Sequence, residues 1–152
     1  MYFYNLIKQI SKNKKIALFI DMDGVIASYD FGKPLNFKTK RPLKSSIRTL
    51  EKVSKMNNVE LYILSICKKD TEINDKNSWL DQHAPFFKKS NRYILSKETI
   101  TGQTSGEMKS LFLKYYPSKC QKVLVDDDNG ILKEIKKEIK DIILLQDSEL
   151  ID

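Results

Sequence analysis

The stretch ALFIDMDGVIASYD, residues 17–30, decides the fold. A run of apolar residues leads directly into Asp21, a second carboxylate follows at Asp23, and Gly24 comes next. A continuous apolar run of this length is typical of a strand that is buried on both faces of a parallel sheet. We therefore predict a buried strand that delivers two carboxylates to one edge of a sheet, with Gly24 letting the chain turn away at once.

The rest of the chain alternates between helix and strand patterns. Helices are expected before the first strand and within residues 41–56, 70–87, 104–117 and from 129 onward. Further strands are expected within residues 57–65, 92–96, 121–128 and 142–145. This alternation predicts an α/β fold, a three-layer α/β/α Rossmann-like arrangement around a mainly parallel sheet. The 152 residues suit one domain, 1–152, with a small flap hairpin at about residues 27–40 and no large cap domain.

The composition of the chain bears on membrane association, redox compartment and charged partners. No apolar run approaches the roughly 20 residues of a membrane-spanning helix, so no membrane association is expected. The two cysteines, Cys67 and Cys120, form neither a disulfide framework nor a zinc motif, which favours a reducing, cytoplasmic setting. The net charge of +7 is compatible with a nucleic-acid partner. Because 24 of the 27 basic residues are lysines spread along the chain, compositional bias explains the charge equally well.

Polar side chains follow three of the expected strands. They are Asp21 and Asp23 after the first strand, Ser65 after the second, and Asp126 with Asp127 after the fourth. In an open parallel sheet the ligand crevice lies outside the carboxyl ends of the strands, so these groups are expected to meet there. Four carboxylates in one crevice would repel one another unless a cation lay among them. Oxygen ligands of this kind point to Mg²⁺.

The order of these motifs resembles that of the haloacid dehalogenase-like (HAD) superfamily of phosphohydrolases. DMDGV (21–25) is similar to its first motif, LYILS (61–65) to its second, and VLVDDD (123–128) to its acidic fourth motif. The resemblance covers roughly residues 16–130. Within the superfamily, NSWLDQHAPFF is similar to the 5'-deoxynucleotidase-like group, and the capless layout resembles the phosphatase domain of polynucleotide kinases.

Chemical roles follow for the two carboxylates of the first motif. Asp21 is expected to attack phosphorus and form an aspartyl-phosphate, while Asp23 protonates the leaving oxygen and later activates water. The resemblance implies that Mg²⁺ is held by Asp21, Asp126 and the backbone carbonyl of Asp23. Asp127 is expected to bind the metal through water or to hold the catalytic lysine.

A lysine and a hydroxyl are expected to bind the transferred phosphoryl group. Ser65 is the hydroxyl that the resemblance implies. Lys109 is the favoured lysine because it lies near the start of the helix that precedes the acid-ended strand, with Lys97 and Lys114 as alternatives. Lys68 and Arg41 are candidates for substrate binding, although both fit solvated surface charge as well.

The short intervals between the motifs limit the choice of substrate. Asp23 and Ser65 are 42 positions apart, and Ser65 and Lys109 are 44 apart, which leaves no room for a cap domain. A nucleotide or another phosphorylated metabolite is the leading substrate class. An open crevice also suits a phosphate at a nucleic-acid end, or a lid supplied by a second subunit in a homo-oligomer. A non-catalytic protein that binds phosphate or nucleic acid with the same fold is the remaining alternative.

The acidic motifs do not fit two other kinds of site. An EF-hand calcium loop needs glycine at its sixth position, whereas Gly24 is fourth. A phosphoryl-receiver module carries its paired acids on the first strand and its phosphoacceptor on a middle strand, which is the reverse of the order here. His83, the only histidine, is expected to pack at a helix end rather than to act in catalysis.

Overall fold

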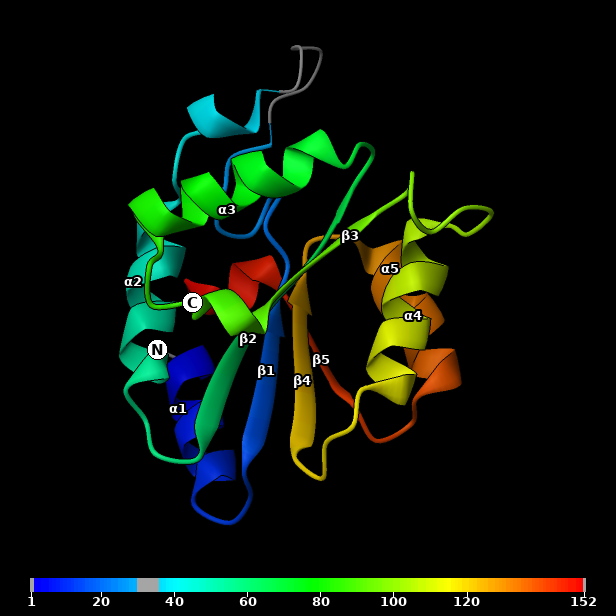
Figure 1. The fold of residues 1–152 in the computed structure, drawn as a ribbon. Coiled ribbons are helices and arrows are strands. Elements are labelled where there is room, and N and C mark those ends of the chain that lie inside the picture. The colour runs from blue at the N-terminus through cyan, green and yellow to red at the C-terminus, as the bar shows by residue number, and fades with distance from the viewer. Residues whose placement is uncertain (1, 30–35, 152) are drawn as a thin grey trace.

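A computed structural model describes residues 2–29 and 36–151 as an α/β fold built on one parallel sheet (Figure 1). The strand order is β3-β2-β1-β4-β5, so the predicted first strand is central. The strands are β1 (Ile16–Ile20), β2 (Val59–Cys67), β3 (Arg92–Ser96), β4 (Gln121–Asp126) and β5 (Ile143–Gln146). All four pairings between neighbouring strands are parallel, which confirms the predicted fold class.

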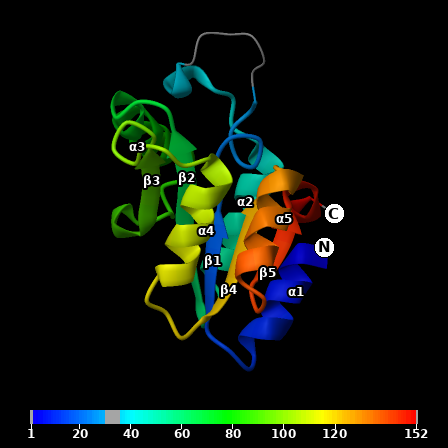
Figure 2. The same ribbon diagram turned by 90° about the vertical axis from the view of Figure 1, so that its right-hand side faces the viewer.

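Helices cover both faces of the sheet. They are α1 (Tyr2–Ser11), α2 (Lys44–Ser54), α3 (Thr71–His83), α4 (Ser105–Tyr115) and α5 (Asn129–Glu138). Helices α1, α2 and α3 lie on one face, and α4 and α5 lie on the other, where Figure 2 shows them in front of the sheet. None of the helices described is long and apolar enough to cross a membrane.

The residues of β1 explain why this strand is central. Every residue of β1 is buried. Leu18 belongs to a buried cluster that also contains Leu50 of α2 and Trp79 of α3. Phe19 belongs to the cluster on the opposite face, together with Leu113 of α4. Successive side chains of a strand point to opposite faces, so a strand between two helical layers has to be apolar at every position. The uninterrupted apolar run before Asp21 is the sequence signature of that position.

Strand β2 continues farther than the sequence pattern indicated. It was expected to end at Ser65 but runs to Cys67, because its last residues pair with the end of β3 (Ile66 with Leu95 and Cys67 with Ser96). Since Ile20 at the end of β1 is level with Ile63, Ser65 still lies beyond the end of the central strand. The hydroxyl therefore reaches the carboxyl edge from inside β2.

The expected flap hairpin falls partly on residues 30–35, which lie outside the described residues. Its base is described: Ala27 forms an antiparallel bridge with Pro42, and the Ser28 amide donates to the Arg41 carbonyl at 2.8 Å. Between them, Phe37–Thr39 forms a short 3-10 helix rather than part of a strand. This segment lies beyond the carboxyl ends of the strands (Figure 1), and Phe37 packs edge-on against Trp79.

Candidate active site

Three carboxylates meet at the carboxyl edge of the central strands. Asp21 follows β1, Asp126 ends β4, and Asp127 comes directly after it. Each offers an oxygen that lies within 4.8 Å of those of the other two. The Asp21 amide donates to the Val125 carbonyl at 3.0 Å, which extends the β1–β4 pairing by one residue and holds the two strand ends together.

Gly24 is the position that lets the two acidic motifs approach each other. Its φ is +78°, in the left-handed region that favours glycine. A Cβ added there would lie 2.1 Å from Oδ2 of Asp127. The glycine therefore serves the turn after Asp23 and also the close approach of the Asp127 carboxylate.

Lys109 is the lysine that lies among the carboxylates. Its Nζ is 2.6 Å from Asp126 Oδ2 and 3.1 Å from Asp21 Oδ1, and the side chain is buried. A capping box between Thr104 and Glu107 begins α4 and places Lys109 in the first turns of the helix, at the carboxyl edge. Burial alone would lower the pKa of this ammonium, but the Asp21 and Asp126 carboxylates outweigh it and raise the pKa.

The two alternative lysines lie elsewhere. Lys97 is exposed after β3, where its backbone amide donates to the Cys67 carbonyl. Lys114 is exposed near the end of α4, with its Nζ 5.7 Å from the centre of the Tyr115 ring. Of the three candidate lysines, the structure therefore places Lys109 among the carboxylates and the other two away from them.

Burial makes the negative charges of this cluster costly. Burial raises the pKa of Asp21 from its ordinary 3.8 to about 7, with Lys109 opposing the rise and Asp126 adding to it. Burial and the neighbouring Asp126 raise the pKa of Asp127 to about 6. A divalent cation among the three carboxylates would favour their ionised forms, and their hard oxygen donors are those that Mg²⁺ prefers. The donor set therefore fits Mg²⁺.

Asp23 faces a different environment from Asp21. Its carboxylate accepts hydrogen bonds from the ammonium groups of Lys40 and, at 3.2 Å, of Lys76. Burial would raise the pKa of Asp23, but the charge of Lys76 and the hydrogen bond from Lys40 together outweigh burial and lower it. The Asp23 carboxylate is not part of the three-carboxylate cluster, so only its backbone carbonyl remains a candidate metal ligand.

Lys76 and Lys40 were not anticipated from the sequence. Lys76 is 2% exposed, and its Nζ donates to Ser65 Oγ at 2.7 Å and to the Ile66 carbonyl at 3.0 Å as well as to Asp23. The Nζ atoms of both lysines lie 5.0 Å from the centre of the Phe37 ring, within range of cation–π attraction. Together they form a buried, positively charged pair beside the cluster of acids.

A sequence signal for Lys76 did exist. In α3 it lies three residues before Trp79 and four before Leu80, both of which are buried. Residues at these spacings share one helix face, so Lys76 stands on the apolar stripe of α3. A lysine in that position has to find a buried anion. Lys40 carried no such signal, because it stands in a lysine-rich segment without helical periodicity.

The remaining predicted residues divide into two groups. Ser65 belongs to the site: it is fully buried, and its Oγ accepts the hydrogen bond from Lys76, which leaves its own proton free to donate. Lys68 does not line the site cavity; its side chain is exposed and its backbone amide donates to Glu72. Arg41 lines a neighbouring cavity that meets the site at Gly24.

The carboxylates open into a cavity of about 780 Å³. Its walls come from the ends of β1 and β4, the start of α4 and α5, and Tyr29. Asp128, the third acid of the DDD run, has a structural role: its Oδ1 accepts from the amides of Gly130 and Ile131 and caps α5. The run therefore supplies two site carboxylates followed by a helix cap.

Comparisons with known proteins support the fold. No protein-family model and no curated protein sequence matches the chain. A solved structure described as the Pnkp1/Rnl/Hen1 RNA repair complex contains a chain with the same fold, with a TM-score of 0.67 and 18% sequence identity. The match covers 88% of this chain and 42% of that one, so this chain spans less than half of its structural relative.

Proposed function

We propose that this protein is a Mg²⁺-dependent phosphomonoesterase of the HAD type that hydrolyses its substrate through an aspartyl-phosphate. The observation that carries the proposal is the cluster of Asp21, Asp126 and Asp127 around the Lys109 ammonium at the carboxyl edge of a parallel sheet. Beside it lie a hydroxyl and two buried lysines, which provide the positive charge that a transferred phosphoryl group requires.

Asp21 is the nucleophile in this mechanism. One of its carboxylate oxygens attacks phosphorus, the bond from phosphorus to the leaving oxygen breaks, and Asp23 donates its proton to that oxygen. Water then attacks the phosphorus of the aspartyl-phosphate and gives a proton to Asp23. The bond between phosphorus and the Asp21 oxygen breaks, so phosphate is released and the Asp21 carboxylate is restored. Each proton that Asp23 donates in the first half is regained in the second.

The ammonium groups of Lys76 and Lys40 control the protonation state of the Asp23 carboxyl during the reaction. In the free protein they hold its pKa low, so that the carboxyl is ionised at neutral pH. A bound phosphate brings a second anion to the same ammonium groups. The two ammonium groups then interact less strongly with Asp23, and the phosphate adds a negative charge near its carboxylate. Both changes raise the pKa of Asp23 and favour its protonated form.

Mg²⁺ is proposed to be held by Asp21, Asp126 and Asp127. When bound, it neutralises charge on the phosphoryl oxygens and keeps Asp21 ionised. Lys109 contacts two of the same carboxylates, so it holds them in place and contributes a fixed positive charge at the cavity.

A nucleotide or another phosphorylated metabolite is our leading substrate class. A phosphate at the end of a nucleic acid is the second candidate, and two observations favour it. The described residues of the loop between β1 and α2, and those between β2 and α4, form no cap domain over the cavity. The structural relative also belongs to an RNA repair complex.

The proposal is tested with an aryl phosphate and Mg²⁺. We expect the wild-type protein to release phosphate and Asp21→Asn to lose several orders of magnitude in kcat, because the amide cannot act as the nucleophile. Glu51→Gln, the same chemical change at an exposed helix position, is the matched control and should retain activity. Undiminished turnover in Asp21→Asn would refute the mechanism.

The substrate class is tested separately by comparing kcat/KM values. The panel contains nucleoside monophosphates, sugar phosphates, and oligonucleotides phosphorylated at the 3' or the 5' end. A preference for the oligonucleotides would favour the second candidate. Absence of turnover with every substrate, together with phosphate binding, would instead identify a non-catalytic binding protein.

A further inference from the structure

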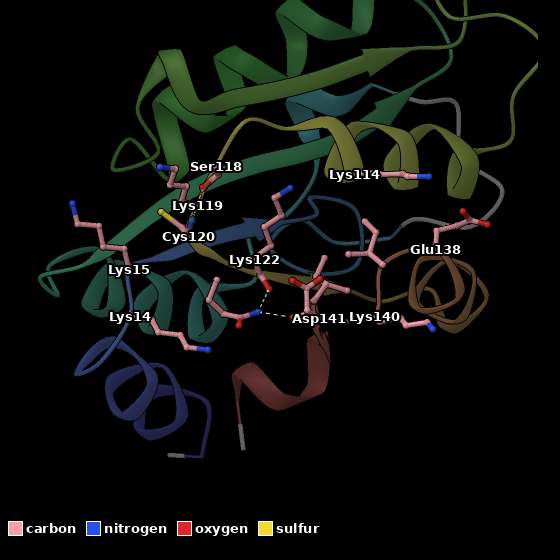
Figure 3. Close-up of a pocket in the computed structure, with 13 residues that line it drawn as sticks. Lys14, Lys15, Lys114, Ser118, Lys119, Cys120, Lys122, Glu138, Lys140 and Asp141 are labelled. Atoms are coloured by element: carbon pink, nitrogen blue, oxygen red, sulfur yellow. Dashed lines mark hydrogen bonds between the residues drawn. The ribbon is translucent and has the colours of Figure 1, made fainter.

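A second cavity, of about 730 Å³, lies at the opposite edge of the sheet, where the strands begin (Figure 3). It is bounded by the loops before β1, β4 and β5, and by the carboxyl ends of α4 and α5. Six of its thirteen lining residues are lysines: Lys14, Lys15, Lys114, Lys119, Lys122 and Lys140. Glu138 and Asp141 are the two acids in its wall, so positive charge predominates.

Most of this positive charge is unpaired. Lys122 has a structural role, because its ammonium donates to the Leu113 and Tyr116 carbonyls at the end of α4. The other five lysines are exposed, and none of them forms an ion pair with any residue in 2–29 or 36–151. Like charges that gather without partners cost free energy, and a polyanion would remove that cost.

Two further lysine contacts lie near the ends of the helices at this cavity. The carboxyl end of a helix carries partial negative charge, and both α4 and α5 end at the cavity. Lys122 caps α4, and Lys136 in the last turn of α5 donates to the Lys140 carbonyl at 2.9 Å and the Ile142 carbonyl at 3.2 Å, both in the segment that follows the helix. These two lysines offset part of the negative charge at the helix ends, and the five unpaired lysines add positive charge to the cavity wall.

An exposed aromatic ring lies beside one of the lysines that line the cavity. Tyr115 is 72% exposed at the end of α4, and the Nζ of Lys114, which lines the cavity, lies 5.7 Å from the centre of its ring. Lysines next to an exposed aromatic ring are the groups that bind single-stranded nucleic acid, because the lysines neutralise phosphates and the ring stacks on a base. An acidic protein would require the charge but not the ring.

We propose that this basic cavity binds the backbone of a single-stranded nucleic acid, with Tyr115 stacking on a base. The site is distinct from the candidate active site: β4 spans six residues between the two edges, a distance of about 17 Å. Binding of nucleic acid at this cavity does not depend on phosphatase activity at the other edge.

The test measures the binding of a fluorescently labelled RNA strand by anisotropy. The strand has about ten nucleotides and hydroxyl groups at both ends, so it offers no phosphomonoester to the candidate active site. The test variant carries Lys14→Gln, Lys15→Gln, Lys119→Gln and Lys140→Gln. The side chains of these four lysines form no hydrogen bond or ion pair with another described residue, so the variant should fold normally, and its circular dichroism and melting temperature check this.

A second quadruple variant controls for net charge. It carries Lys8→Gln, Lys52→Gln, Lys55→Gln and Lys89→Gln, four exposed lysines that do not line the cavity. We expect the cavity variant to lose at least tenfold in affinity and the control to lose less than twofold. The slope of log affinity against log salt should fall by up to about 3 in the cavity variant, since each lost phosphate contact removes about 0.7.

Tyr115→Ala tests the stacking contact. It should weaken binding of the single strand about tenfold and leave binding of a duplex of the same sequence unchanged, because duplex bases are already stacked. Equal losses in the two quadruple variants would show attraction to net charge alone and overturn the proposal. Tighter binding of poly-glutamate than of RNA would overturn it in favour of an acidic protein partner.

Discussion

Replacing Asp21 with asparagine should make the metal-free protein more stable. Burial raises the pKa of this carboxyl from 3.8 to about 7, so the folded protein binds its proton more tightly than the unfolded chain does. At a pH above 7 the folded state carries a buried charge that the unfolded state holds in water. Asparagine has nearly the same shape and no charge, so it removes this penalty.

The size of the effect follows from the shift in pKa. A difference of about three units corresponds to roughly 4 kcal/mol, at 1.36 kcal/mol for each unit. This value is a ceiling for the gain in the free energy of unfolding. For a chain of 152 residues it corresponds to a rise in melting temperature of about 8–16 °C.

The sign of the pH dependence is set by the direction of the shift. Because the folded-state pKa is raised, the wild-type protein loses stability relative to Asp21→Asn as the pH rises from about 4 to about 7. Below pH 4 the carboxyl is protonated in both states and the two proteins should be equally stable in this respect. The advantage of the variant should therefore be largest at pH 8 and vanish near pH 4.

Urea unfolding in the presence of EDTA measures this difference. The free energy of unfolding is determined by circular dichroism at several pH values for the wild type, Asp21→Asn and the control Glu51→Gln. Adding Mg²⁺ should then stabilise the wild type, because only the folded state offers the three carboxylates together, and should stabilise Asp21→Asn much less. A variant that is less stable than the wild type at pH 8 without metal would refute this account of the site.

Two further changes test other parts of the site. Gly24→Ala should lower the free energy of unfolding by about 1–3 kcal/mol. It should also raise the Mg²⁺ concentration needed for half-maximal activity, because the new Cβ meets Asp127. Gly102→Ala is the control for backbone strain, since Gly102 has the same φ of +78° and no atom within 4 Å of an added Cβ, and it should leave the Mg²⁺ requirement unchanged. Lys76→Met removes the larger of the charges that lower the pKa of Asp23, so the alkaline limb of the pH–rate profile should move to higher pH, whereas Lys76→Arg should leave it in place. A limb that stays unmoved in Lys76→Met would show that Asp23 does not titrate as the acid.

Much of the fold was determined by local patterns in the sequence. The apolar run before Asp21 predicted the central strand, because only a strand between two helical layers is buried at every position. The same logic placed Asp126 and Asp127 at the end of β4. The capping spacing of Thr104 and Glu107 predicted the start of α4, from which Lys109 reaches Asp126. Parallel strands bring their carboxyl ends to one edge, so strand order was not needed to expect the cluster.

Tertiary structure alone decided the contacts that join distant segments. Lys76 and Asp23 are 53 positions apart, and their hydrogen bond depends on how α3 packs over the end of the sheet. Lys40 reaches the same carboxylate from the position directly after the short 3-10 helix Phe37–Thr39, and no periodicity predicts where that helix lies. The spread of lysines along the sequence likewise looked diffuse, and only the meeting of three loops and two helix ends gathers six of them around one cavity. Charge acts through space, so its effect is set by the distances that folding creates and not by order along the chain.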